Sequence, residues 1–187
     1  GKGATLGVLI KNAEALELME KVDTLVVDKT GTLTEGKPQL VSVQALEGFE
    51  EDEVLRLAAS LERASEHPLA EAIVRGAEEK DLKLTTTEQF ESITGKGVTG
   101  GVDGHAVALG NVKLLQQLSI DESGLHVDAD AGRKQGQTVM FVAIDGKIAG
   151  LIGVADPIKE STPQAIQDLY AEGVKVVMLT GDNRTTA

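Results

Sequence analysis

The chain of 187 residues has no cysteine, and only 2% of its residues are aromatic. Disulfide bonds and thiolate metal ligands are therefore excluded, and any hydrophobic core has to be built from aliphatic side chains. Basic residues are also in the minority, since 18 Lys and Arg stand against 30 Asp and Glu. The net charge of −12 argues against nonspecific binding to nucleic acid or to an anionic membrane, so no nucleic-acid partner is expected.

Long apolar runs are absent as well. No stretch approaches the roughly 20 apolar residues that a membrane-spanning helix needs, and no secretory signal is visible. We therefore expect this piece of chain to be soluble by itself. Its length, with 41% hydrophobic residues, suffices for one ordinary domain or for two small ones.

What is present centres on the seven residues Asp-Lys-Thr-Gly-Thr-Leu-Thr at 28–34. They follow the apolar run 25–27, which predicts a short buried strand of a parallel sheet with Asp28 at its carboxyl end. Ligand sites form at that end of open α/β sheets, and Gly31 lets backbone N–H groups turn toward an anion. The carboxylate of Asp28 can attack a phosphoryl group there, provided that Lys29 or Mg²⁺ offsets the charge. A solvated turn of ordinary polar residues is the alternative.

A second loop of this kind follows residues 174–179, another apolar run rich in β-branched residues. The preceding helix is expected to begin with Thr162 as its N-cap, so strand, helix and strand predict a parallel strand beside the first. Thr180 and Gly181 would then lie at the same sheet edge as Asp28, where a hydroxyl and backbone amides can hold a phosphoryl group. A plain Gly-Asp-Asn turn is an equally open interpretation.

Between these two loops the pattern changes to that of an α+β module. A helical hairpin is predicted over residues 54–77, and two β-hairpins with Asp-Gly turns follow it. We expect the module to span 43–150, inserted between the pieces 1–42 and 151–187 of another domain.

Two features of this module permit a ligand. Pro68 suits the first turn of a helix, which places His67 at a helix start where N–H groups favour an anion, although a cap or surface role is more common for a lone histidine. Residues 95–100 match the weak pattern G-x-G-x-x-G, but a β-hairpin follows it instead of the helix that a dinucleotide site requires. The glycines still allow a ligand close to the backbone, and a bulged strand explains them equally well.

The motif at 28–34 resembles the phosphorylation motif of P-type ATPases, and the resemblance covers essentially the whole chain. Further phrases occur in the order of the heavy-metal-transporting branch: Ser-Glu-His-Pro-Leu at 65–69, Gly-Lys-Gly at 95–97, Asp-Pro at 156–157 and Thr-Gly-Asp-Asn at 180–183. The segment 7–17 is most similar to the copper-exporting members.

This resemblance implies an incomplete haloacid-dehalogenase-like Rossmann phosphorylation domain with an inserted antiparallel-sheet nucleotide-binding domain. It implies Asp28 as the phosphoacceptor, and Mg²⁺ bound by its carboxylate and the main-chain carbonyl of Thr30. It also implies that Thr180 contacts the phosphoryl group, that Glu62 contacts the adenine of ATP and that His67 orients the nucleotide. The other residues expected at these sites are Lys29, Gly95, Gly97, Gly110, Asn111, Asp156, Gly181 and Asp182.

The family continues after Thr-Gly-Asp-Asn with a further lysine and a Gly-Asp-Gly-x-Asn-Asp segment that supplies a Mg²⁺ carboxylate, and neither is in this sequence. The actuator domain and the membrane helices with their Cys-Pro-Cys metal site, which would be its partners in the full-length protein, are also missing. We therefore expect a cytosolic fragment of a membrane pump that exports a heavy-metal cation, foremost Cu(I). The fragment is expected to bind ATP or ADP without efficient turnover. The alternatives are a soluble phosphatase of the same fold with a cap domain, and a noncatalytic nucleotide-sensing module.

Overall fold

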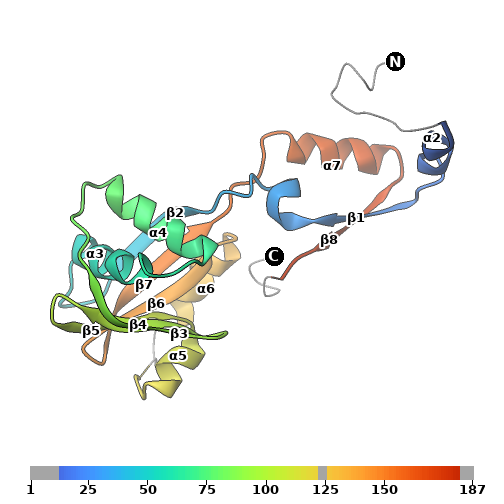
Figure 1. The fold of residues 1–187 in the computed structure, drawn as a ribbon. Helices are drawn as coiled ribbons and strands as arrows, with labels where there is room; N and C mark the ends of the chain where they lie inside the picture. Colours follow the sequence, from blue (N-terminus) through green and yellow to red (C-terminus); the bar gives the residue numbers. More distant parts are fainter. Residues whose placement is uncertain (1–12, 122–125, 182–187) are drawn as a thin grey trace. The chain divides into compact units, whose positions relative to one another are not determined.

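The computed structural model describes residues 13–121 and 126–181, which form two compact units (Figure 1). The first unit contains the described residues up to Thr34 together with Ile158–Thr180, and the second runs from Glu35 to Pro157. Within the two described ranges, no helix combines the length and the apolar character that crossing a membrane requires.

The division between the units differs from the expected boundaries after residues 42 and 150. Strand β2 (Gln39–Ala45) already pairs with β7 (Lys147–Ala155) in the second unit, and Gln39 lies opposite Ala155. The expected boundaries fall inside these two strands, which pair with each other along their length and so belong to one sheet. The chain instead crosses between the units at 34/35 and at 157/158.

The first unit is built on two parallel strands, β1 (Thr24–Asp28) and β8 (Lys175–Leu179), with Asp28 opposite Leu179. Its described helices are α2 (Ala13–Met19) and α7 (Thr162–Ala171), and α7 leads into β8. The predicted parallel strand beside the first is thus confirmed.

The expected burial of the first strand is wrong. Successive residues of a strand point to opposite faces of the sheet. In β1, Leu25 and Val27 are half-buried, whereas Val26 on the other face is 54% exposed. The described residues therefore cover one face of this pair of strands better than the other.

The second unit contains a six-stranded antiparallel sheet with the strand order β2-β7-β6-β5-β4-β3. Both predicted β-hairpins are present, and each is closed by the expected Asp-Gly turn. The bounds of the strands not yet given are β3 (Thr87–Ile93), β4 (Gly97–Val102), β5 (His105–Gly110) and β6 (Thr138–Ile144).

Helices cover both faces of this sheet, and each face has its own aliphatic core. Val142 of β6 packs in the core that the helical hairpin α3–α4 covers, whereas the adjacent Phe141 packs on the opposite face with Leu114 and Leu115 of α5. The helices of this unit are α3 (Glu51–Glu62), α4 (Pro68–Glu78), α5 (Val112–Gln117) and α6 (His126–Lys134). The predicted class, a parallel strand pair with an inserted antiparallel-sheet module, is confirmed.

Candidate functional site

A pocket of about 530 Å³ lies at one end of the six-stranded sheet. The loop between α3 and α4, the β3–β4 hairpin, the end of β5 and the start of β6 form its walls. Its volume is within the range of roughly 300–1,000 Å³ that is typical of small-molecule sites. Six of the residues expected at the nucleotide line it: Glu62, His67, Gly95, Gly97, Gly110 and Asn111.

Glu62, the last residue of α3, is the buried carboxyl group of this pocket. The side chain is 6% exposed, and its Oε2 has no hydrogen-bond partner among the described residues. Burial raises the pKa of Glu62, and a hydrogen bond from the Ser65 side chain acts in the opposite direction. A buried acceptor without a partner costs free energy, and a donor on a bound ligand would remove that cost.

His67 caps α4 and also lines the pocket. Its Nδ1 accepts a hydrogen bond from the backbone N–H of Leu69 at 3.2 Å, and Pro68 occupies the first turn. Since Nδ1 acts as an acceptor, the proton of the neutral ring is assigned to Nε2. The exposed Nε2–H is then available as a donor to a ligand.

Gly97 allows strands β4 and β5 to approach each other closely at the pocket wall. Its φ of +148° is disfavoured for any residue with a side chain. A Cβ atom at this position would overlap the carbonyl oxygen of Leu109 and lie 2.6 Å from Cα of Gly110. This part of the pocket wall is therefore bare backbone.

Asn111 fixes the glycine hairpin to the start of α5. Its Nδ2 donates to the carbonyl of Gly95 at 2.9 Å, and its backbone N–H donates to the carbonyl of Lys96 at 2.8 Å. Its Oδ1 accepts from the N–H of Lys113 at 3.0 Å and so caps the helix. Asn111 thus positions the wall that it lines.

Sequence reasoning missed the contribution of β6 to this pocket. Thr138, Val139 and Met140 line it, although they lie far along the chain from the other lining residues. Their apolar, β-branched composition indicated a strand but carried no signal for the ligand site.

In the first unit, Asp28 lies at the carboxyl end of β1 and is exposed. The parallel register that pairs it with Leu179 puts Thr180 directly after the partner position on β8. The predicted convergence of these two strand ends is therefore present in the fold. Gly181, the next residue, is exposed, and Asp182 lies outside the described residues.

A tight turn follows Asp28. Thr30 has φ −74° and ψ 123°, and Gly31 has φ 75° and ψ −12°, which are the central angles of a type II turn. This turn requires a positive φ at its third residue, so the glycine of the motif has a backbone role.

The buried hydroxyl of Thr34 orients this turn. It accepts from the N–H of Gly31 at 3.1 Å and donates to the carbonyl of Lys29 at 3.1 Å. Because C=O and N–H of a trans peptide point in opposite directions, the carbonyl of Thr30 points away from Thr34. The carbonyl of Thr30 is thereby turned outward.

The oxygens of Asp28 and Thr30 fit a partial Mg²⁺ site. Mg²⁺ is usually held by one or two carboxylates, with waters and substrate phosphates completing the shell. Among the residues that the structure describes there is no cluster of three or more His, Cys, Asp or Glu able to hold a metal. The donor set of one carboxylate and one carbonyl therefore suits an ion that binds together with a phosphate.

The segment that leads into α7 also forms hydrogen bonds to this turn, and no sequence pattern predicted these contacts. The Lys159 ammonium donates to the carbonyl of Gly31 at 2.7 Å, and the Thr162 hydroxyl donates to the carbonyl of Leu33 at 2.7 Å. The expected N-cap role of Thr162 is wrong, because Ser161 occupies that position without a side-chain cap. The Thr162 hydroxyl reaches the Asp28 loop instead.

Asp156 does not line the pocket. Its carboxylate accepts from the backbone N–H groups of Gly36 at 3.1 Å and Lys37 at 2.9 Å. It thus ties together the two segments of the second unit that lead to the first. Its expected role at the nucleotide stays a prediction.

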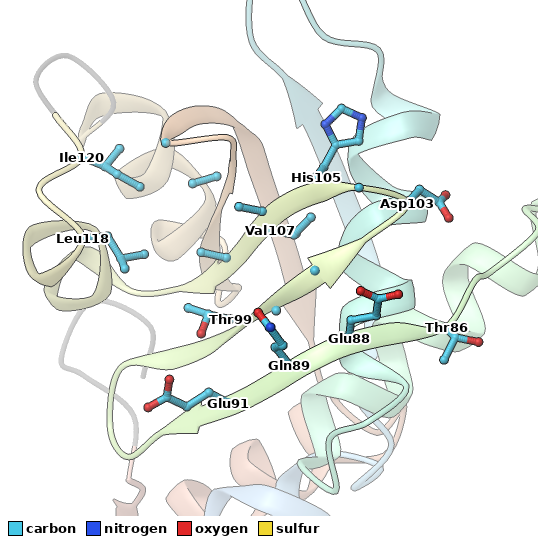
Figure 2. Close-up of a pocket in the computed structure, with 17 residues that line it drawn as sticks. Thr86, Glu88, Gln89, Glu91, Thr99, Asp103, His105, Val107, Leu118 and Ile120 are labelled. Carbon is cyan, nitrogen blue, oxygen red and sulfur yellow. The ribbon is translucent and has the colours of Figure 1, made fainter.

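A second cavity, of about 860 Å³, lies over β3, β4 and β5, and Figure 2 shows Leu118 and Ile120 at one side of it. None of the expected site residues lines it. Its lining includes the carboxylates of Glu88, Glu91 and Asp103, with Glu88 and Glu91 on β3 (Figure 2). Carboxylates repel phosphates, so this cavity is a poor candidate for a nucleotide.

Comparison with known proteins agrees with this architecture. A sequence model of the haloacid dehalogenase-like hydrolases matches residues 22–187. The chain is 58% identical over all 187 residues to the copper-exporting P-type ATPase of Legionella pneumophila (strain Philadelphia 1), of which it covers 25%. It thus spans about a quarter of the length of the curated relatives that it matches.

Two solved structures extend the comparison. A zinc-transporting PIB-type ATPase in its E2·Pi state superimposes with a TM-score of 0.80 at 35% identity, covering 98% of this chain and 30% of that one. The catalytic domain of the CPx-ATPase CopB-B, studied for its conformational changes upon nucleotide binding, gives a TM-score of 0.66 at 27% identity and covers 94% and 61%. With its Asp-Lys-Thr-Gly-Thr-Leu-Thr turn at a strand end, the chain belongs to the haloacid dehalogenase-like hydrolases and, within them, to the heavy-metal P-type ATPases.

Proposed function

We propose that this chain is the cytosolic ATP-binding and phosphorylation core of a P-type pump that exports a heavy-metal cation. The observation that carries the proposal is the exposed carboxylate of Asp28, which ends a parallel strand and opens a turn stabilised by hydroxyl groups. Cu(I) is the favoured cargo, because the relative with 58% identity is named a copper exporter. The actuator and membrane domains of the same protein are the proposed partners, and the membrane domain would bind the cargo.

In the proposed reaction, a carboxylate oxygen of Asp28 attacks the γ-phosphorus of ATP. The bond from phosphorus to the bridging β–γ oxygen breaks, and ADP leaves with the electron pair. Water later hydrolyses the aspartyl phosphate and returns Asp28 and inorganic phosphate. The Thr180 hydroxyl would contact the phosphoryl group, and Lys29 would offset part of its charge. Asp28 and the carbonyl of Thr30 would hold Mg²⁺, which would neutralise further charge when bound.

The pocket of the second unit is the proposed ATP site. The unpartnered Oε2 of Glu62 would accept a hydrogen bond from the adenine amino group, and the bare backbone at Gly95 and Gly97 would let the nucleotide approach closely. Gly110 and Asn111 complete that wall. The proposal also keeps Asp156, Gly181 and Asp182 as residues that help hold the nucleotide.

Replacing His67 tests this site. His67→Asn keeps an oxygen that can cap α4 but ends short of the position of the ring Nε2–H, and His67→Gln replaces the ring donor with a flexible amide. We expect both variants to stay folded and to bind ATP about tenfold more weakly, since a hydrogen bond to a charged group contributes roughly 1.5–3 kcal/mol. Isothermal titration with ATP gives the affinity, and nucleotide-induced NMR shifts report the binding mode.

ATP binding by the wild-type chain also distinguishes the pump from a soluble phosphatase with a cap domain, because only the pump needs this module to bind ATP. Wild-type chain that fails to bind ATP would contradict the proposed site. Unchanged affinity and unchanged shifts in both His67 variants would remove His67 from it.

Glu62→Gln should stabilise the folded chain at neutral pH. The pKa of Glu62 is raised above its ordinary value of 4.5 by burial, so the folded state holds this proton more tightly than the unfolded state. Stability is then lost as pH rises from about 4.5 through the folded-state pKa, and the cost is fully present above it. We expect the variant to lose this slope and to gain on the order of 1 kcal/mol at pH 7.5. Thermal unfolding between pH 4.5 and 8 measures both effects.

Glu66→Gln is the matched control for that experiment, because Glu66 is exposed in the same loop. It should leave the stability and its pH dependence unchanged within about 0.5 kcal/mol. An equal slope in wild type and Glu62→Gln would show that another group causes it.

A further inference from the structure

The side chain of Lys159 forms a hydrogen bond to the turn after Asp28. Its ammonium lies 2.7 Å from the carbonyl oxygen of Gly31, a residue 128 positions away in the sequence. The side chain is half-buried within the first unit. An ammonium group on a carbonyl oxygen forms a charge-assisted hydrogen bond, which is stronger than a neutral one.

Other contacts fix the segment that carries Lys159. Its backbone N–H donates to the carbonyl of Leu33 at 3.0 Å, and Ile158 forms an antiparallel bridge with Thr34. Together with the Thr162 hydroxyl, these contacts hold the base of the loop. The Lys159 ammonium reaches past them to the third residue of the turn.

Gly31 needs such a contact because a glycine can adopt backbone φ and ψ angles that other residues rarely adopt. A type II turn converts to type I when its central peptide flips, and a glycine at the third position permits both forms. A flip here would reverse the direction of the Thr30 carbonyl. Thr34 holds the N–H of Gly31 and Lys159 holds its C=O, so the two side chains restrain both sides of this residue.

We propose that Lys159 is a positioning residue for phosphoryl transfer to Asp28. By holding the Gly31 carbonyl it keeps the turn in the form in which the Thr30 carbonyl points away from Thr34. This inference rests on the function proposed above. Lys159 does not line the nucleotide pocket, so it acts on the transfer step and not on ATP affinity.

The test is rapid-quench phosphorylation of the complete pump with γ-labelled ATP. Lys159→Met removes the donor at similar side-chain length, Lys159→Arg keeps a donor, and Asp28→Asn reports whether the label is on the proposed residue. We expect Lys159→Met to lower the rate constant of labelling about 10- to 30-fold, because small misplacement of reacting groups can cost up to about 10²-fold. The final amount of label and the half-saturating ATP concentration should change less than twofold, and Lys159→Arg should recover most of the rate.

Rate constant and amplitude distinguish positioning from a structural role. A variant that is only less stable loses amplitude, while its surviving molecules react at the wild-type rate. That result would overturn the inference. A wild-type rate with full amplitude would overturn it as well. Failure of Lys159→Arg to recover rate would also count against it. Label that persists in Asp28→Asn would instead overturn the proposed function, whatever the Lys159 variants do.

Discussion

Asp28→Asn is expected to abolish the incorporation of phosphate from γ-labelled ATP into the complete pump. The amide has the size of the carboxylate but is not a nucleophile at this pH, and loss of the attacking group should reduce labelling by at least about 10³-fold. The turn itself should persist, because the Thr34 and Lys159 side chains hold it by hydrogen bonds to its backbone. Acid-stable, hydroxylamine-sensitive label on the protein is the measurement.

Asp23→Asn is the matched control, since Asp23 is an exposed carboxylate immediately before the same strand. It should label like wild type. Label that persists in Asp28→Asn would move the nucleophile to another residue.

The complete pump is the right protein for this measurement. We propose that the 187 residues alone bind ATP without efficient turnover, because Asp28 and the Thr30 carbonyl form only part of a charge-neutralising site. Each missing group that stabilises the transition state typically costs about 10²–10³ in rate. Vigorous Mg²⁺-dependent turnover by the 187 residues would contradict this.

The elements of the fold were accessible from sequence because their signals are local. Asp-Gly pairs between predicted strands indicated both hairpins, and Pro68 indicated the start of α4. The parallel pairing of β1 and β8 followed from the order strand, helix, strand, which is typical of parallel sheets. For the hairpins and for α4, one short segment carried enough information to be interpreted by itself.

The unit boundary and the exposure of β1 needed contacts that no local pattern encodes. The run that became β2 looks like any half-buried strand, and only its pairing with β7 assigns it to the second unit. Likewise, three apolar residues before Asp28 predict burial on both faces, yet Val26 has little covering among the described residues.

The residues of the candidate site also differ in whether a local sequence pattern predicts them. The Asp28 turn was predicted from its own residues, whereas Glu62 was expected only from the family resemblance. Its defining property, a buried oxygen without a donor, exists only once α3, the loop after it and the sheet are assembled. Lys159 was missed because a contact across 128 residues leaves no spacing to detect.

Gly97→Ala is expected to destroy the nucleotide pocket. Gly97 pairs with Gly110 between β4 and β5, and an added Cβ would overlap the Leu109 carbonyl oxygen and lie 2.6 Å from the Gly110 Cα. These are backbone atoms, which cannot move aside as a flexible side chain can, and the φ of +148° adds further strain. We expect a loss of about 2–3 kcal/mol in the free energy of unfolding and about 100-fold in ATP affinity.

Gly101→Ala makes the same substitution in the same strand, where a Cβ would lie 3.7 Å from the Glu88 Cβ, an ordinary contact. It should change stability by less than about 0.5 kcal/mol and leave ATP affinity unaltered. Urea unfolding and isothermal titration, run on both variants, separate the two effects. If Gly97→Ala loses stability but binds ATP like wild type under folding conditions, the nucleotide does not lie against this wall. Because the pocket depends on the close approach of Gly97 to Gly110, the ATP site would then have to lie elsewhere in the second unit.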